Sequence, residues 1–298
     1  MPGAELEVEV RPAWPHRLPS RGSPDGTTRV RGGVLTRLVH VDETPVVVYA
    51  WRRRDGSCVL RAASDADQPE PEALEVAIER MRFALGIDDD FGEFYDAFRG
   101  DRLLARAIRR RPWIRPRRNT SPWEALAWAV TKQLIESPRA AAIQRRIVRR
   151  WGPELHELRD VPTAAAIAGA APAELESMDL SPSRAVAMVR TAREVATGRA
   201  DLRDPDADRR LVAIPGIGTW TVRCLGLFGR GDPDALPSGD LGYIKLIGRL
   251  AGLGRRATIE EVEEFFEPYA PFRGLAGTFI LATYHGLVAA GPPLRKAA

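Results

Sequence analysis

The residues with the clearest capacity for chemistry lie between positions 211 and 246. Pro215-Gly216-Ile217-Gly218 separates two helical patterns, and a single carboxylate, Asp240, follows 22 residues after Gly218 (240 − 218), directly behind Leu-Pro-Ser-Gly. Glycines permit a tight hairpin between two helices, and the amides of such a hairpin and of the next helical turn point outward together. Those amides form an anion site that suits a DNA phosphate. A lone carboxylate can stabilise the positive charge left on a sugar when an N-glycosidic bond breaks.

Each part of this segment also has an ordinary structural interpretation. Gly-x-Gly alone occurs in many helix–helix turns, and an aspartate at the start of a helix usually serves as an N-cap. Asp240 can do both. The hairpin and the aspartate taken together as one motif are far more specific than either part alone.

Helices must position these residues. One helix is predicted to end near Ile214, and the next is predicted to begin at about Thr219. The segment from Ser121 to Glu124 has the pattern of a capping box with proline at the first helical position. The helix behind it carries Leu126, Val130 and Leu134. Other helices are expected from Pro138, from Ser181-Pro182, from Asp204-Pro205, from Thr258 (a capping box with Glu261), and from about Gly274 to Ala289.

The first part of the chain is predicted to mix strands with helices. Alternating or β-branched runs indicate strands at 6–10, 34–41, 46–51 and 57–62, the last two joined by a hairpin at Asp55-Gly56. A helix is expected from Pro71 to Gly86, and four aromatic residues between 91 and 98 form a further short helical face. We therefore expect an α+β protein with an N-terminal α/β domain, residues 1–112, and a mainly α-helical domain, residues 113–298.

The densest positive segment, Arg109–Arg118, contains two prolines and marks the expected junction between these domains. Two interpretations remain open from the sequence. The segment is either a solvated linker or a phosphate contact made from the groove between the domains.

Composition narrows the classes of function. The formal net charge of +4 and the sequence pI of about 9.4 permit a polyanionic partner without requiring one. Cys58 and Cys224 are too few for an iron–sulfur cluster or a four-cysteine zinc site, and the four histidines show no metal-ligand spacing. No P-loop and no Gly-x-Ser-x-Gly motif occur. Because the sequence has no apolar run of about 18 residues and no secretory signal, we expect a cytoplasmic protein that does not bind membranes. We also expect it to be a monomer.

Two motifs together carry a family resemblance. Leu-x-x-Ile-Pro-Gly-Ile-Gly-x-Trp-Thr, residues 211–221, and Leu-Pro-x-Gly-Asp-Leu-Gly, residues 236–242, resemble the helix-hairpin-helix, Gly/Pro-rich-loop, aspartate superfamily of DNA glycosylases. Within it, the bacterial 3-methyladenine DNA glycosylase II branch is the most similar, over roughly residues 118–290. That family has an N-terminal domain similar to half of a TATA-binding protein, ahead of a helical bundle split by the active-site cleft. The resemblance implies an enzyme of base excision repair that binds double-stranded DNA containing a damaged base and excises alkylated purines without a required cofactor.

The resemblance assigns Asp240 and Trp220 their roles. Asp240 matches the essential carboxylate of the family. Trp220 stands where members that also cut the strand carry a Schiff-base lysine, and Lys245 lies beyond Asp240 on a helix, so base removal without lyase activity is implied. The Trp220 ring is expected to stack on an extruded, electron-poor base. Plain core packing is the alternative for this side chain.

Other positions follow from the same resemblance. Leu134, in Lys-Gln-Leu-Ile-Glu-Ser, matches the wedge that fills the gap left by a flipped base, although a leucine in a helix is more often part of the core. Gln133 and Tyr284 are expected in the base pocket with Trp220. The expected DNA contacts are Leu134, Gly216, Gly218 and Thr221, and a structural monovalent cation is expected on the backbone carbonyls of Val212, Ile214 and Ile217.

The sequence departs from the family at three pocket positions where aromatic residues are expected. They hold Cys224, Leu241 and Thr283. Arg273 matches a family arginine, with a structural salt bridge as the alternative. A thinner pocket leaves open a glycosylase of the same superfamily for deaminated or other damaged bases. A non-catalytic helix-hairpin-helix DNA-binding protein is a further alternative.

Overall fold

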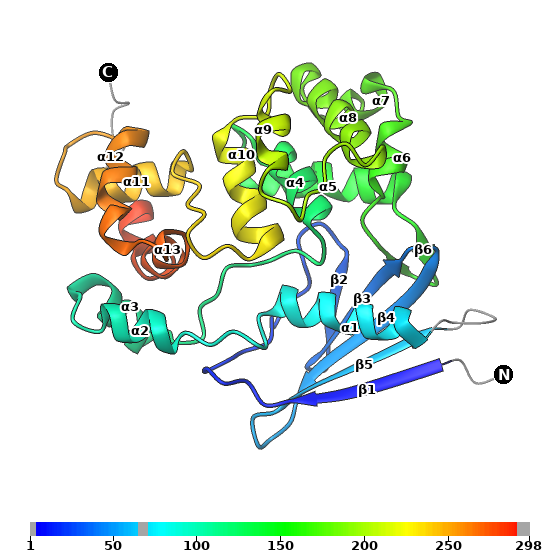
Figure 1. The fold of residues 1–298 in the computed structure, drawn as a ribbon, viewed down its shortest axis with the longest axis horizontal. Helices are drawn as coiled ribbons and strands as arrows, with labels where there is room; N and C mark the ends of the chain where they lie inside the picture. The colour runs from blue at the N-terminus through cyan, green and yellow to red at the C-terminus, as the bar shows by residue number, and fades with distance from the viewer. Residues whose placement is uncertain (1–3, 65–70, 291–298) are drawn as a thin grey trace.

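Alternation of buried and partly exposed side chains makes the N-terminal segment a sheet. The computed structural model describes residues 4–64 and 71–290. Among these residues, five strands form an antiparallel sheet in the order β1-β5-β4-β3-β2 (Figure 1). Their bounds are β1 Ala4–Val10, β2 Thr28–Arg31, β3 Val34–Val41, β4 Thr44–Arg52 and β5 Cys58–Ser64. The four predicted strands are confirmed, whereas the short edge strand β2 was not predicted.

Helix α1 (Pro71–Leu85) packs on one face of this sheet (Figure 1). Its residues Leu74, Ile78 and Met81 are buried in the same core as Val48 and Leu60 of the sheet. The helix stops, as predicted, at Gly86, which has φ +64°. The hairpin between β4 and β5 also has the predicted glycine, since Gly56 has φ +92°.

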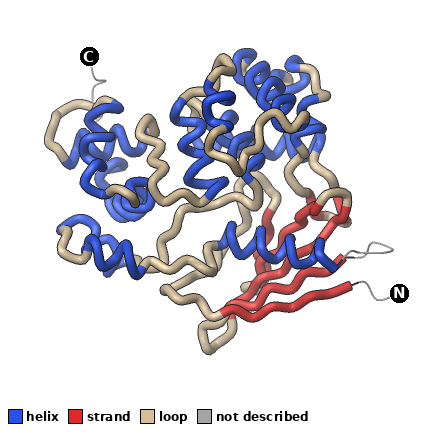
Figure 2. Tube along the Cα trace, viewed as in Figure 1, coloured by secondary structure: helices blue, strands red, loops and turns tan. Residues whose placement is uncertain are grey.

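The rest of the described chain is mainly helical (Figure 2). This composition confirms the predicted α+β fold. The elements are α2 Gly92–Phe98, α3 Arg102–Arg110, α4 Pro122–Lys132, α5 Ser137–Trp151, the small hairpin β6 Glu154–Leu155 and β7 Leu158–Arg159, α6 Ala164–Ala168, α7 Pro172–Glu176, α8 Pro182–Ala196, α9 Ala207–Val212, α10 Thr219–Cys224, the π-helical turn η1 Leu225–Arg230, α11 Leu241–Leu250, α12 Ile259–Phe266, the 3-10 turn η2 Glu267–Tyr269 and α13 Arg273–Ala290.

The helices form two groups with separate hydrophobic cores. Helices α4 to α10 share one core, in which Leu126, Ile143 and Met188 are buried. Helices α2 and α3 share the other with α11, α12 and α13, where Phe94 and Phe279 pack with their ring centroids 5.7 Å apart. A domain division after residue 112 stays a prediction. The cores follow a different partition, because α2 and α3 pack with the C-terminal helices.

Helix α4 differs in two ways from its predicted form. The Ser121 hydroxyl caps the helix by accepting from the Glu124 amide at 3.2 Å. The Glu124 carboxylate, however, accepts from the Thr120 amide and hydroxyl and from buried Arg37 of β3, at 2.8 to 3.0 Å. The helix also ends at Lys132, so Leu134 does not lie on it as expected. The buried pair with Arg37 joins α4 to the sheet and draws Glu124 away from a reciprocal capping bond.

The arginine-rich segment is not simply a solvated linker, because two of its arginines, Arg115 and Arg118, pack against the N-terminal part of the protein. A DNA contact by its exposed arginines stays a prediction. Arg115 donates to the carbonyls of Gly86 and Pro15 at 2.7 and 2.8 Å. Arg118 pairs with Asp89 and lies over the ring of Phe83, 4.5 Å from its centroid. Both guanidinium side chains are almost fully buried. The carboxylate and carbonyls of the N-terminal part satisfy these charges.

In the part of the chain that the structure describes, no helix has the length and apolar character needed to cross a membrane.

Candidate nucleic-acid interface and active site

The hairpin between α9 and α10 has the predicted place and shape. Ile214 and Ile217 are buried and anchor it, while Pro215, Gly216 and Gly218 are exposed. Gly216 has φ +92°, and a methyl group added there would lie 3.2 Å from the Cβ of Ala187 in α8. Glycine is therefore required at Gly216 by conformation and by close packing.

Gly218, unlike Gly216, does not use the conformational freedom of glycine. Its φ is −110° and its ψ is 179°, an extended conformation that any residue adopts. An added Cβ would meet nothing within 4 Å. The residue is the N-cap of α10, so its bare backbone leaves the start of that helix open to a bulky anion such as phosphate.

Asp240 lies at the N-terminus of α11 and is half-buried. Its Oδ1 accepts from the Gly242 amide at 2.7 Å, which confirms the expected cap. The Asp240 amide donates to the Pro237 carbonyl at 2.9 Å, and the buried Ser238 hydroxyl donates to Glu263 at 2.9 Å. The Leu-Pro-Ser-Gly loop is thus held on both sides of the acid. Among the described residues, Oδ2 of Asp240 accepts no hydrogen bond.

Two other titratable groups lie close to Asp240. Burial, and after it the negative charge of Asp240, raises the pKa of the Cys224 thiol and of the Tyr243 phenol far above their usual values. Both groups therefore stay protonated and neutral at physiological pH. Neither neighbour therefore competes with Asp240 as a base.

Trp220, in the first turn of α10, packs against Gly239, the residue before Asp240. A methyl group added at Gly239 would lie 3.6 Å from Cδ1 of Trp220. The indole is half-buried, and its buried Nε1 has no hydrogen-bond partner among the described residues. The structure thus brings together the predicted hairpin, Trp220 and Asp240.

Leu134 is fully exposed, with a relative accessibility of 104%. It lies in the loop between α4 and α5 and has φ +54°, which costs a non-glycine residue on the order of 1–2 kcal/mol. The alternative of core packing for Leu134 is therefore wrong. A large apolar side chain that is held outward next to a hairpin has the form of a wedge.

Gln133 and Thr221 join the wedge loop, residues 133–136 between α4 and α5, to the hairpin. The side-chain amide of Gln133 donates to the Gly216 carbonyl at 2.8 Å and to the Thr221 hydroxyl at 2.9 Å. The Thr221 side chain is only 1% exposed. These bonds give both side chains a positioning role. They do not support a base contact by the Gln133 amide nitrogen, and burial prevents a direct contact of the Thr221 side chain with DNA.

Tyr284 and Arg273 belong to the packing of α13. The Tyr284 hydroxyl is 3.5 Å from the Leu103 carbonyl of α3, and its ring packs against the core of the C-terminal helices. This contact directs Tyr284 toward α3 and does not support a place in the base pocket. Arg273 makes a two-pronged salt bridge with Asp234, with Nε 2.9 Å from Oδ1, which confirms the structural alternative.

Sequence reasoning missed Arg184, whose Nη1 donates to the Gln133 carbonyl at 2.9 Å. It lies about fifty residues from the loop that it contacts, and an arginine early in a helix carries no signal of such a contact. The described residues contain no cluster of three or more histidine, cysteine or acidic side chains able to hold a metal. The cation on the carbonyls of Val212, Ile214 and Ile217 stays a prediction; the Ile214 carbonyl accepts from the Ile217 amide at 3.0 Å.

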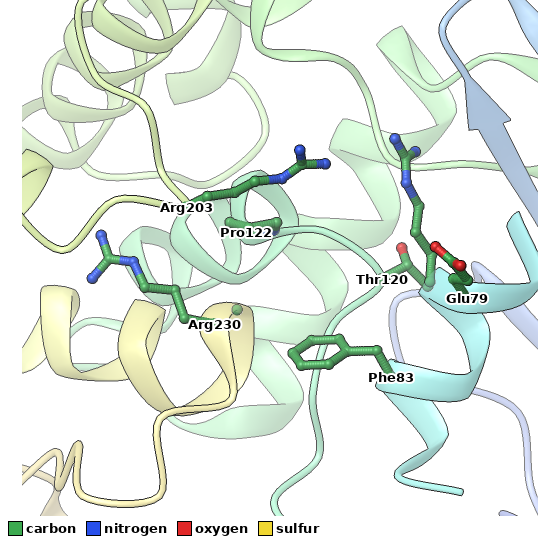
Figure 3. A pocket seen from close by; sticks show the side chains of 8 residues that line it. Glu79, Phe83, Thr120, Pro122, Arg203 and Arg230 are labelled. Carbon is green, nitrogen blue, oxygen red and sulfur yellow. The ribbon is translucent and has the colours of Figure 1, made fainter. Parts of the chain in front are cut away.

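A hollow of about 300 Å³ lies elsewhere, between α1, the segment before α4 and the end of η1 (Figure 3). Phe83, Thr120 and Arg203 are among the residues that line it. Arg230 also contributes to the wall, where its guanidinium is paired with Asp208 at 2.7 Å. The lining includes neither the hairpin nor Asp240, so this hollow is separate from the candidate site.

The model of the HhH-GPD superfamily base excision DNA repair proteins matches residues 127–271. The chain is 24% identical to a DNA-3-methyladenine glycosylase of Bacillus subtilis over 267 residues, which cover 85% of this chain and 86% of the relative. Among solved structures, the 3-methyladenine DNA-glycosylase from Archaeoglobus fulgidus superposes with a TM-score of 0.80 at 22% identity, covering 95% of this chain and all of that one. An 8-oxoguanine glycosylase/lyase of Clostridium acetobutylicum, in complex with double-stranded DNA, gives a TM-score of 0.70 at 16% identity, covering 88% of each chain.

Proposed function

The chain belongs to the HhH-GPD superfamily of base excision DNA repair proteins, and from this premise we propose that it is a DNA glycosylase of the 3-methyladenine type that excises alkylated purines. One observation carries the proposal. Asp240 caps α11 and is partly exposed, and the residue before it, Gly239, packs against Trp220 of the helix that follows the glycine hairpin. A phosphate grip and a carboxylate for the sugar are then found within one segment of the site.

The chemistry assigned to Asp240 follows from its surroundings. When the N-glycosidic bond breaks, positive charge develops on the sugar, and a fixed carboxylate stabilises that charge. The bond from the Gly242 amide to Oδ1 fixes the group, while Oδ2 can face the sugar or an attacking water. An alkylated purine already carries positive charge and leaves readily, so the base requires no strong acid.

Trp220 supports two finer parts of the proposal. Its indole cannot form the Schiff base that strand cleavage by a lysine would need, so we propose base removal without lyase activity. The electron-rich face of an indole also attracts a cationic ring, which favours alkylated bases over neutral ones. Leu134, exposed and apolar, is proposed to fill the gap in the duplex once the base has turned out.

Single-turnover excision on a panel of duplexes tests this function. The panel contains 3-methyladenine, a deaminated base and 8-oxoguanine, and the products are separated as free base and as cleaved strand. We expect release of the alkylated base without strand cleavage. Asp240→Asn is expected to slow release by about a hundredfold or more, because the neutral amide stabilises a cationic sugar poorly.

Asp101→Asn provides the matched control. Asp101 is likewise an N-cap: it precedes α3 and accepts from the amides of Leu103 and Leu104 at 2.9 and 2.8 Å. Normal excision by Asp101→Asn separates loss of a cap from loss of the catalytic carboxylate. If the wild-type protein releases only a deaminated or an oxidised base, that base replaces the alkylated purine as the proposed substrate. Equal activity of Asp240→Asn and wild type would contradict the assignment of Asp240.

A further inference from the structure

The loop between α4 and α5, residues 133–136, has a shape that its own sequence does not explain. It holds Leu134 fully exposed and in the left-handed region of the backbone. Residues other than glycine avoid that region, and a leucine side chain gains more by burial than by exposure. Groups outside the loop must therefore stabilise this conformation.

Arg184, in the first turn of α8, contacts the base of the loop. Its Nη1 donates to the Gln133 carbonyl at 2.9 Å and lies 3.4 Å from the Thr131 carbonyl, while its Nε donates to the Ser181 hydroxyl at 2.8 Å. A guanidinium at this position satisfies carbonyls that the end of α4 leaves without helical partners, and it meets the negative end of the helix dipole. The contact fixes the backbone immediately before Leu134.

Gln133 connects the same loop to the hairpin. Its amide donates to the Gly216 carbonyl at 2.8 Å and to the Thr221 hydroxyl at 2.9 Å. On the other side of the hairpin, a methyl group at Gly216 would lie 3.2 Å from the Cβ of Ala187, three residues after Arg184 (187 − 184). Residues three apart share one face of a helix, so a single face of α8 supports both the wedge loop and the hairpin.

We propose that Arg184 is a positioning residue that holds Leu134 ready to enter the duplex, and that Gln133 couples this loop to the hairpin so that both engage DNA as one unit. The inference rests on the proposed function and deepens it. Arg184 acts only through Leu134, and Gln133 ties the grip on a phosphate to the insertion of the wedge.

The test measures base opening separately from excision. A fluorescent adenine analogue placed beside the lesion reports opening in stopped flow, single-turnover release reports excision, and a titration reports duplex affinity. Arg184→Ala is expected to slow opening and excision about tenfold, the effect of losing one hydrogen bond to a charged group, with affinity changed less than about threefold. Arg184→Lys is expected to recover part of the rate, because its ammonium can still donate to the Gln133 carbonyl.

Two further variants locate the effect. Arg184→Ala combined with Leu134→Ala is expected to be no slower than Leu134→Ala alone, because the proposal has Arg184 act through Leu134. Gln133→Ala is expected to slow opening as Arg184→Ala does. Arg193→Ala is the matched control, because Arg193 also lies on α8 and donates to a carbonyl, that of Ala168 at 3.2 Å, but has no contact with the loop. It is expected to behave as wild type.

A lesion that faces a mismatched base separates positioning from general damage to the fold. Opening costs less at a mismatch, so the deficit of Arg184→Ala should shrink to less than about threefold there. An equal deficit on both duplexes, wild-type opening by Arg184→Ala, or a double variant slower by the product of the two single effects overturns the role of Arg184. Wild-type opening by Gln133→Ala overturns the coupling. Wild-type protein that opens the duplex but releases no base contradicts the proposed function and leaves the opening measurements to decide the positioning role; if it opens no duplex, both fail.

Discussion

The hairpin–aspartate segment, residues 211–246, and the arginine-rich segment, residues 109–118, stand out equally in the sequence, but the fold places them in opposite environments. Pro215, Gly216 and Gly218 are exposed, whereas Arg115 and Arg118 are folded against Asp89 and backbone carbonyls. The difference shows that density of charge does not identify a phosphate-binding surface. The guanidinium groups of Arg115 and Arg118 find acceptors within the fold, whereas Pro215, Gly216 and Gly218 of the hairpin stay at the surface.

The largest expected effect is a loss of stability when a buried arginine of the arginine-rich segment is removed. Arg118→Ala removes a buried partner of Asp89 and the cation that lies over Phe83. It should lower the free energy of unfolding by about 2–4 kcal/mol, because Arg115, at 3.4 Å, is the only other cation paired with Asp89 among the residues that the structure describes. Urea denaturation measures the change. Arg109→Ala, at an exposed arginine of the same segment, should stay within about 0.5 kcal/mol. Similar small effects for both variants would mean that Arg118 is not a structural residue.

The next effect concerns conformation in the hairpin itself. Gly216→Ala forces a residue with a Cβ to adopt φ +92° and places that Cβ 3.2 Å from Ala187. A loss of about 1–2 kcal/mol in the free energy of unfolding is expected, together with weaker duplex binding. Denaturation and fluorescence anisotropy measure the two changes. An unchanged midpoint would show that the hairpin adapts without cost.

Gly218→Ala, at the neighbouring glycine, should leave the stability nearly unchanged but weaken duplex binding. The residue is extended and an added Cβ meets no atom within 4 Å, so stability should change by less than about 0.5 kcal/mol. The new methyl group would crowd a phosphate at the start of α10, so duplex affinity should still fall. If affinity is unchanged, the phosphate does not approach the hairpin at Gly218.

The smallest effect is a pH dependence in the scaffold away from the hairpin. His16 is buried beside Cys58, and burial is the main cause that lowers its pKa below the usual 6.5, with Arg115 and Arg52 acting in the same direction. The folded state therefore binds this proton less readily than the unfolded state does. The stabilisation is complete above about pH 6.5 and is lost as the pH falls toward the lowered pKa. In the His16→Gln variant, the urea midpoint should vary less between pH 5 and 7 than in the wild type. An unchanged pH dependence would mean that another group causes it.

The sequence predicts those parts of the site that depend on neighbours along the chain. The hairpin glycines, the N-cap role of Asp240 and the start of α10 at Thr219 all follow from local patterns, and the structure has each of them. The helix starts at Pro122 and at Ile259 behind Thr258 follow from capping patterns in the same way.

Other features depend on contacts between distant segments, which no local pattern contains. Glu124 leaves its capping box because Arg37, 87 residues earlier, attracts its carboxylate. Leu134 leaves the helix pattern because Arg184 and the Gln133–hairpin bonds stabilise a loop there. Strand β2 was missed because it is only four residues long and lies at the edge of the sheet.

The partition of the cores has a consequence for motion. The chain passes from one helical group to the other between α3 and α4 and returns between η1 and α11, and Asp240 is the last residue of the return. Any hinge movement that spreads the two helical groups to admit a duplex must change the backbone conformation of these two connecting segments. Such a movement would change the separation between Asp240 and Trp220, which belong to opposite helical groups. Under the proposed function, closure of the two groups would set the distance between the Asp240 carboxylate and the sugar.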